Sequence, residues 1–128
     1  MIAEHRITFR VRYQETDAQG RVHHANYFTY FEMGRVEQLR ASGYDYRRLE
    51  EDGTLMVVYD INCRYFEGAK YDDVLTLTTR TVRVTAARVF HEYEVHREEV
   101  LIAKGTSILA CVDRSGAVRR MPEWMHLA

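Results

Sequence analysis

The sequence predicts an α+β protein in which one antiparallel sheet packs against a single long helix. Several segments alternate apolar and polar residues with a period of two, as strands with one buried face do. One segment, residues 26 to about 42, reads instead as a helix. Four strand-like segments follow it in succession, which favours antiparallel pairing. A sheet that curls round one central helix fits these pieces and forms a two-layer domain.

The first half of the chain is expected to hold a strand, a loop and this helix. Every second residue is apolar over residues 7–13, which predicts a strand with one buried face. Residues 14–25 break the pattern and should form a loop. Apolar side chains cover most of the girth of the helix over residues 26–42, so we expect it to be largely buried. Gly43 is a suitable C-terminal stop.

The second half is expected to be mainly strands. A short helical turn over residues 46–51 comes first, before Gly53. The predicted strands cover residues 55–66, 73–85, 89–97 and 101–113. Asp113-Arg114-Ser115-Gly116 is a turn signature, and a short tail strand to about Met121 should follow it.

The composition is that of one globular domain, which we expect to span residues 1–128. Hydrophobic residues make up 46% and charged residues 29% of the chain, which excludes a disordered protein. The formal net charge of -1 offers no cationic surface for nucleic acid. The first ten residues lack the apolar core of a secretory signal, and no apolar run approaches the roughly 20 residues of a membrane span. We expect a cytoplasmic protein without a membrane span.

The cysteines and histidines give no sign of a metal site. Cys63 and Cys111 each fall within a predicted strand, where two buried thiols fit a reducing compartment, although the sequence does not exclude a disulfide. His91 and His96 lie on opposite faces of one predicted strand, so they form no local metal pair. We expect no metal. A serine-hydrolase triad is not expected either, because the chain has no Gly-x-Ser-x-Gly motif.

The segment over residues 13–27 carries the chemistry. It places an acid, a glycine, two histidines and an asparagine directly before the buried helix. The start of a helix leaves backbone N–H groups without partners, and an oxyanion formed from a thioester carbonyl would be stabilised there. The Asp17 carboxylate could attack that carbonyl or activate water. Two structural alternatives also fit: Asp17 as an Asx-turn residue, and Asn26 as the helix cap.

A motif in this segment resembles a known family. Its residues are Tyr13, Glu15, Thr16, Asp17, Gly20, Val22, His24, Ala25, Asn26 and Tyr27, followed by Phe31, Glu32 and Arg35. The motif closely resembles that of the 4-hydroxybenzoyl-CoA thioesterase-like hotdog family, especially the branch associated with the Tol–Pal system. The resemblance implies a hotdog fold, an antiparallel β-sheet wrapped around one long central helix. It also implies active sites at the interface of a homodimer, often paired into a homotetramer.

The resemblance further implies an acyl-CoA thioesterase that hydrolyses a CoA thioester to a free acid and CoA, with no separate cofactor. Asp17 occupies the position of the catalytic carboxylate, and both the nucleophile and the general-base role stay open. His24 occupies the position whose backbone N–H polarises the thioester carbonyl, and its side chain would help to bind substrate. Gly20 occupies a turn where only a small residue suits the close approach of the chain.

The remaining motif residues are expected to shape the substrate site. Asn26 and Tyr27 would organise the loop and pack the helix. His23 departs from the family, which usually has an aromatic or apolar residue there, so the sequence leaves open which histidine faces the acyl pocket. Glu15 is expected to be structural, with a competing general-base role as the alternative. Glu32, Arg35 and Glu37 would pair within the helix, reach a partner subunit or lie on a solvated face.

The sequence also allows two other functions. A hotdog hydratase or dehydratase would usually carry a different acid–base motif on the central helix, and this chain has no equivalent Asp/His pair there. A non-catalytic acyl-thioester binding module would retain CoA esters without releasing thiol. Either a substrate or a ligand of this kind needs cations for the CoA phosphates. The candidates, for each of which ordinary strand solvation is an equal explanation, are Arg64, Lys70, Arg80, Arg83, Arg88 and Lys104.

Overall fold

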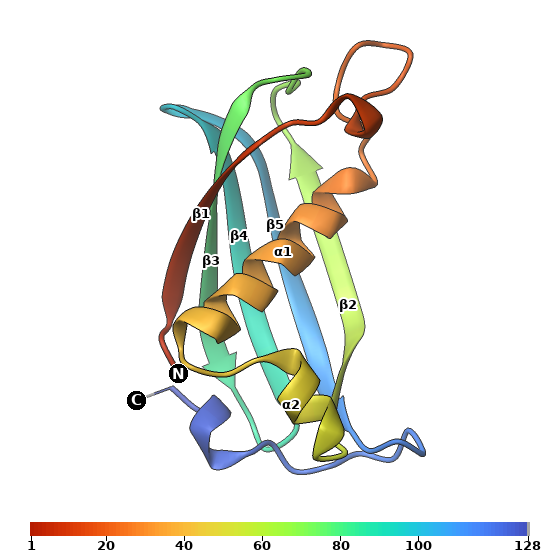
Figure 1. The fold of residues 1–128 in the computed structure, drawn as a ribbon, viewed down its shortest axis with the longest axis vertical. Coiled ribbons are helices and arrows are strands. Elements are labelled where there is room, and N and C mark those ends of the chain that lie inside the picture. The colour runs from red at the N-terminus through yellow and green to blue at the C-terminus, as the bar shows by residue number, and fades with distance from the viewer. Residues whose placement is uncertain (128) are drawn as a thin grey trace.

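A five-stranded antiparallel sheet packs one face against a long helix (Figure 1). The computed structural model describes residues 1–127. The sheet order is β1-β3-β4-β5-β2, so β1 and β2 are the edge strands. The elements are β1 (Glu4–Arg10), η1 (Tyr13–Glu15), α1 (Asn26–Ala41), α2 (Tyr46–Glu51), β2 (Leu55–Tyr65), β3 (Val74–Val84), β4 (Arg88–Arg97), β5 (Val100–Val112) and η2 (Glu123–Met125). The predicted α+β class and element order are confirmed.

Both helices and the last four strands lie within one residue of their predicted bounds, but two other predictions are wrong. The first strand ends at Arg10, because its partner β3 begins at Val74, which pairs with Arg10. Tyr13 lies beyond it in η1 and is 78% exposed instead of buried. The predicted tail strand is also absent from the described chain, where Val118 forms only an isolated bridge with Val112.

Two glycines let α1 lie close to the sheet. A Cβ atom at Gly34 would overlap the Thr79 hydroxyl and come within 2.7 Å of Leu77 on β3. A Cβ atom at Gly105 on β5 would come within 2.5 Å of the Phe31 ring. Phe31 instead stacks on Tyr93, with ring centroids 4.2 Å apart. The absence of side chains at these two glycines therefore leaves room for the helix and for the Phe31 and Tyr93 rings in the core.

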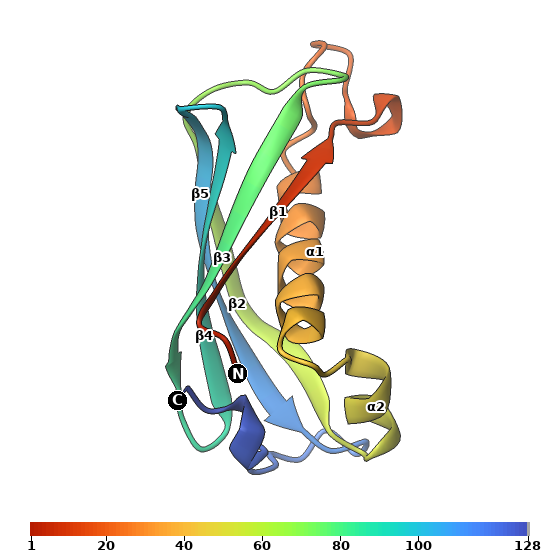
Figure 2. The ribbon, with the colours of Figure 1, turned by 60° about the vertical axis from the view of Figure 1, so that its left-hand side comes forward.

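The helix is buried on one side only, so the expectation of a largely buried helix is wrong. Tyr27, Tyr30 and Phe31 face the sheet, whereas Phe28 and Glu32 are exposed. Figure 2 shows the reason: α1 crosses one face of the sheet, and the sheet curls only partly around it. The uncovered side carries Phe28, which is 36% exposed, together with polar residues such as Thr29 and Glu32.

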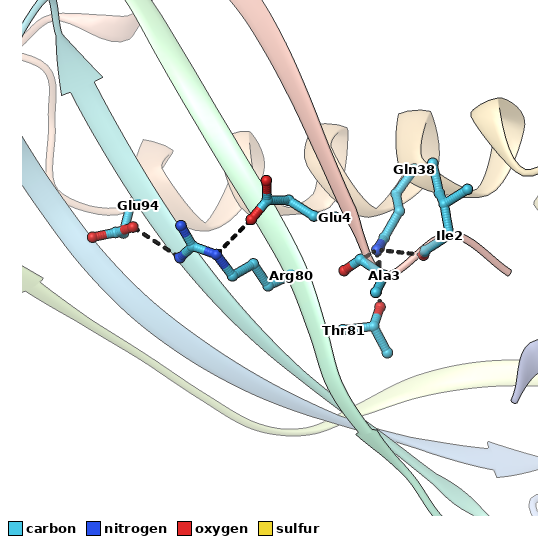
Figure 3. Close-up of polar contacts among 7 residues, drawn as sticks. All are labelled: Ile2, Ala3, Glu4, Gln38, Arg80, Thr81 and Glu94. Atoms are coloured by element: carbon cyan, nitrogen blue, oxygen red, sulfur yellow. Dashed lines mark hydrogen bonds and ion pairs between the residues drawn. The ribbon is translucent and has the colours of Figure 1, made fainter. Parts of the chain in front are cut away.

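A polar contact fixes the far half of α1. Gln38, which is buried, lies 3.2 Å from the carbonyl oxygens of Ile2 and Ala3 and donates to the Thr81 hydroxyl at 3.0 Å (Figure 3). These contacts satisfy a buried amide and tie the helix to the N-terminus and to β3. Nearby, a second apolar cluster forms between the helix end and the C-terminal segment and includes Leu39, Met121 and Met125.

The other face of the sheet carries no helix (Figure 2). Polar and charged side chains alternate outward there, among them Arg80, which forms ion pairs with Glu4 at 2.7 Å and Glu94 at 2.8 Å. Cys63 and Cys111 are both free thiols, and burial raises the pKa of each. No helix in the described part of the chain has the length and hydropathy that a membrane crossing requires.

Candidate active site

The loop between β1 and α1 folds back on itself through a tight turn at Asp17. The Asp17 carbonyl accepts the Gly20 N–H at 2.9 Å, and the Asp17 N–H donates to the Arg21 carbonyl at 2.8 Å. One carboxylate oxygen, Oδ1, accepts the Gln19 N–H at 2.9 Å. The Asx-turn alternative is therefore realised. It engages only Oδ1, and within residues 1–127 the second oxygen, Oδ2, has no hydrogen bond.

Gly20 is required by the backbone of this turn, not by space. Its φ is +78°, in the left-handed region that residues with a Cβ atom adopt at a cost. A Cβ atom there would meet no described atom within 4 Å. The expectation that Gly20 serves a close approach of the chain is therefore wrong, and the positive φ is the physical reason for the glycine.

Glu15 anchors the loop from inside the fold. Its buried carboxylate accepts the Tyr30 hydroxyl at 2.9 Å and the Arg12 backbone N–H at 2.9 Å, and it pairs with the Arg12 guanidinium at 2.9 Å. Burial, followed by the hydrogen bond to Glu15, raises the pKa of Tyr30. The Glu15 carbonyl accepts the Asn26 side-chain amide at 2.8 Å. These contacts make Glu15 a structural residue, as predicted.

Asn26 does not cap the helix. Ala25 is the cap residue and makes no side-chain cap hydrogen bond, while the Asn26 side chain reaches back to Glu15. This contact agrees with the expectation that Asn26 organises the loop. The helix start is instead tightened by the N–H groups of residues 26–28, each of which donates to a carbonyl three residues earlier.

One backbone donor at the helix start is left over. The Ala25 N–H donates to the Nδ1 atom of His23 at 3.1 Å. The His24 N–H, in contrast, has no acceptor anywhere in the described residues. A free backbone N–H at the N-terminal end of a helix can donate a hydrogen bond to a negatively charged group, and the helix dipole strengthens that interaction. The His24 amide can therefore donate to an anionic or polarised oxygen of a ligand.

A cavity of about 270 Å³ opens beside His24. Its lining includes Arg21, Val22, His24, Tyr27, Tyr65 and Phe66. The Tyr65 hydroxyl donates to the His24 carbonyl at 2.9 Å, which ties the end of β2 to the helix start. Burial raises the pKa of Tyr27 and of Tyr65 to about 12, so both hydroxyls stay neutral donors at physiological pH.

The structure brings only some of the predicted site residues together. His24 and Tyr27 line the cavity. His23 stacks on the His24 ring at 4.2 Å but does not line the cavity, so His24 is the histidine that faces it. Asp17 does not contribute to this lining either. A single chain thus places the free His24 amide and the candidate catalytic carboxylate in one loop without enclosing both in one pocket.

Sequence reasoning missed the part of the site that comes from β2. Tyr65 and Phe66 lie about forty positions after His24, and nothing in the period of a strand reports which loop its end will meet. Arg21 was also missed. Its side chain packs over Gly68, where a Cβ atom would lie 2.9 Å from the arginine Cδ.

Comparison with known proteins gives a consistent result. The model of the thioesterase superfamily matches residues 19–103. The chain is 37% identical to the acyl-CoA thioesterase YbgC of Haemophilus influenzae over 105 residues, which are 81% of this chain and 77% of the relative. It is 31% identical to the acyl-CoA thioester hydrolase YbgC of Escherichia coli O157:H7, over 81% and 78% of the two chains. The solved DHNA-CoA thioesterase of Staphylococcus aureus superimposes with a TM-score of 0.89 at 26% identity, over 93% of this chain and 81% of the other.

Proposed function

Because the chain belongs to the thioesterase superfamily, we propose that it hydrolyses acyl-CoA thioesters with Asp17 and the His24 backbone amide as the reacting groups. Membership of this family confirms the resemblance inferred from the loop motif and the expectation of a thioester hydrolase. It favours hydrolysis over the hydratase and the non-catalytic binding module. The acyl group and the reacting residues belong to the proposal.

The free N–H of His24 is the observation that carries the proposal. A thioester carbonyl placed at this amide would gain a hydrogen bond that strengthens as negative charge develops on its oxygen. The amide is held in place by the Tyr65 hydroxyl on the carbonyl of the same residue, and by the adjoining helix turn. The donor therefore needs no reorganisation when the oxyanion forms.

Asp17 supplies the carboxylate in either of two ways. As a nucleophile, its Oδ2 atom would bond to the acyl carbon, the C–S bond would break, CoA would leave as the thiolate and take up a proton, and water would hydrolyse the mixed anhydride. As a general base, Asp17 would accept a proton from the water that attacks the acyl carbon, with the same leaving group. In both routes the turn bond from Gln19 to Oδ1 orients the carboxylate.

A second copy of the chain is proposed to complete the site. The edge strand β2 presents eleven residues, and its Val57, Val58 and Tyr59 side chains are 42%, 49% and 61% exposed. A long apolar edge strand is a template for pairing with another chain. Because β2 ends at the His24 cavity, a copy paired there would lie next to that cavity.

The test of Asp17 is thiol release from a panel of acyl-CoAs by wild type and by Asp17→Asn. We expect a loss of roughly 10²- to 10⁴-fold in kcat. Asp52→Asn is a matched control, since Asp52 is an exposed carboxylate after α2, at the end of the molecule opposite the Asp17 loop (Figure 1). Undiminished turnover in Asp17→Asn would contradict the assigned role.

The test of the second copy is mass by light scattering for wild type and for the double variant Val57→Lys, Tyr59→Lys. We expect a dimer or a tetramer for wild type, and a monomer with reduced thiol release for the variant, whose circular dichroism shows whether it is folded. A wild-type monomer with full activity would refute the shared site.

A further inference from the structure

A second cavity lies on the helix-free face of the sheet, next to the His24 cavity. It has a volume of about 380 Å³, and its lining includes Asn62, Arg64, Phe66, Leu101, Lys104 and Thr106. No acidic side chain contributes to the lining. Both charged groups in it are therefore cations, on the two neighbouring strands β2 and β5.

The two cations lie opposite each other, and neither forms an ion pair within the described residues. Arg64 lies directly opposite Lys104 in the β2–β5 register. Like charges at directly opposed positions destabilise a sheet. Lys104 also lies opposite Glu94 and helps to lower the pKa of that carboxyl, but the larger cause is the hydrogen bond from Arg80, which holds the Glu94 carboxylate at 2.8 Å. Within residues 1–127, no carboxylate lies within 4.0 Å of the charged group of Arg64 or of Lys104.

Most other cations on the strands are already engaged. Arg80 lies between Glu4 and Glu94 (Figure 3). Arg83 and Arg88 lie over aromatic rings, at 5.2 Å and 4.4 Å from the ring centroids. They belong to the end of the sheet where β3 meets β4, away from the end of β2 that contacts His24. Of the strand cations that were candidates for phosphate, only Arg64 and Lys104 share a cavity near the proposed site.

The two cavities adjoin through one residue. Phe66 lines both the His24 cavity and the cavity of Arg64 and Lys104. A ligand with its carbonyl at the His24 amide can therefore continue over the Phe66 ring to the paired cations. The planar guanidinium of an arginine and the ammonium of a lysine are the side chains that bind phosphate oxygens.

We infer that Arg64 and Lys104 bind phosphate groups of CoA while the thioester lies at His24. This inference rests on the proposed function. A phosphate between the two cations would offset the unfavourable pairing of like charges, because each cation would then gain an opposite charge. The pair contributes to affinity for the CoA ester, and it does not touch the reacting atoms.

The test compares two substrates with the same acyl group: the CoA ester and the pantetheine ester, which lacks the nucleotide and its phosphates. For Arg64→Gln and Lys104→Gln we expect KM for the CoA ester to rise roughly 10-fold or more, as for loss of a charge-assisted hydrogen bond. We expect an unchanged kcat, and an unchanged KM for the pantetheine ester. Arg83→Gln, on the same sheet but outside both cavities, is the matched control.

The outcomes separate this inference from the function on which it rests. Unchanged KM for the CoA ester in both variants would overturn the phosphate site while leaving the thioesterase intact. An equal rise in KM for both esters would also overturn it, because that result points to a general distortion of the site. Absence of thiol release from either ester by wild type would overturn the proposed function itself, and this inference with it.

Discussion

Acid is expected to destabilise the fold through His91, whose ring is buried on the helix side of β4. Burial, and then the nearby charge of Arg35, lowers the pKa of His91 from 6.5 to about 3. Tyr93 stacks near it and Thr81 lies across from it on β3, but within the described residues its Nδ1 atom has no hydrogen-bond partner. The folded protein therefore keeps this histidine neutral at pH values at which the unfolded chain protonates it.

The sign and size of the effect follow from that difference. At pH 8, well above 6.5, neither state is appreciably protonated at this residue, and His91 imposes almost no pH dependence. Below pH 6.5, the unfolded state binds a proton that the folded state does not, so the free energy of unfolding decreases as pH falls toward 3. The decrease is about 1.4 kcal/mol for each pH unit below 6.5. Between pH 8 and pH 5 only roughly 1.5 pH units lie in that range, so the free energy of unfolding falls by about 2 kcal/mol.

Urea unfolding followed by circular dichroism at pH 8, 6 and 5 measures this for wild type and His91→Gln. Carboxylates titrate in both proteins, so the difference between the two isolates the histidine. We expect wild type to lose about 2 kcal/mol more than the variant between pH 8 and pH 5. His96→Gln, on the opposite face of β4, is the control. Parallel pH curves for wild type and His91→Gln would refute the reasoning.

Further predictions concern packing, the loop and the cation pair. Gly34→Ala should lower the free energy of unfolding by about 1–3 kcal/mol or more, because its methyl group would overlap Thr79, and urea unfolding measures the loss. Glu15→Ala should cost about 1–3 kcal/mol by leaving the buried Tyr30 hydroxyl without an acceptor, and it should also reduce thiol release, whereas Glu15→Gln should cost less because it keeps an acceptor. Arg64→Gln should leave stability unchanged or raise it by up to about 1 kcal/mol, because a pair of like charges is removed; a clear loss would show that Arg64 supports the fold.

Periodicity predicted the sheet well because each strand has one face on the helix. Val89, His91, Tyr93 and Val95 alternate along the sequence with less buried residues, and the burial of β4 follows this alternation. The same rule misplaced the first strand, because the alternation of apolar residues continues past Arg10 although the partner strand does not. A strand ends where its hydrogen-bonding partner ends, and that information lies in β3, more than sixty residues away.

The candidate site also contains some residues that the sequence predicts and others that it does not. Asp17, Gly20 and His24 lie within one loop, so their spacing could be interpreted locally. The residues that support them come from elsewhere: Glu15 acts through Tyr30 on the helix, and Tyr65 reaches His24 from β2. No local pattern predicts such pairs, because their proximity depends on how the sheet curls around α1.

The polar and charged groups that have no partner within residues 1–127 are of two kinds: those that a ligand can reach and those that it cannot. The Nδ1 atom of His91 and the Thr79 hydroxyl are enclosed in the core and have no hydrogen-bond partner among residues 1–127, so their burial lowers stability. The His24 amide, Arg64 and Lys104 instead border open cavities, where a ligand can reach them. In the proposed function these groups would bind the thioester carbonyl and the phosphates of CoA. Accessibility therefore distinguishes groups that a substrate can reach from groups buried in the core. The accessible groups border the two cavities at the end of the sheet where β2 contacts His24 in the loop that carries the motif.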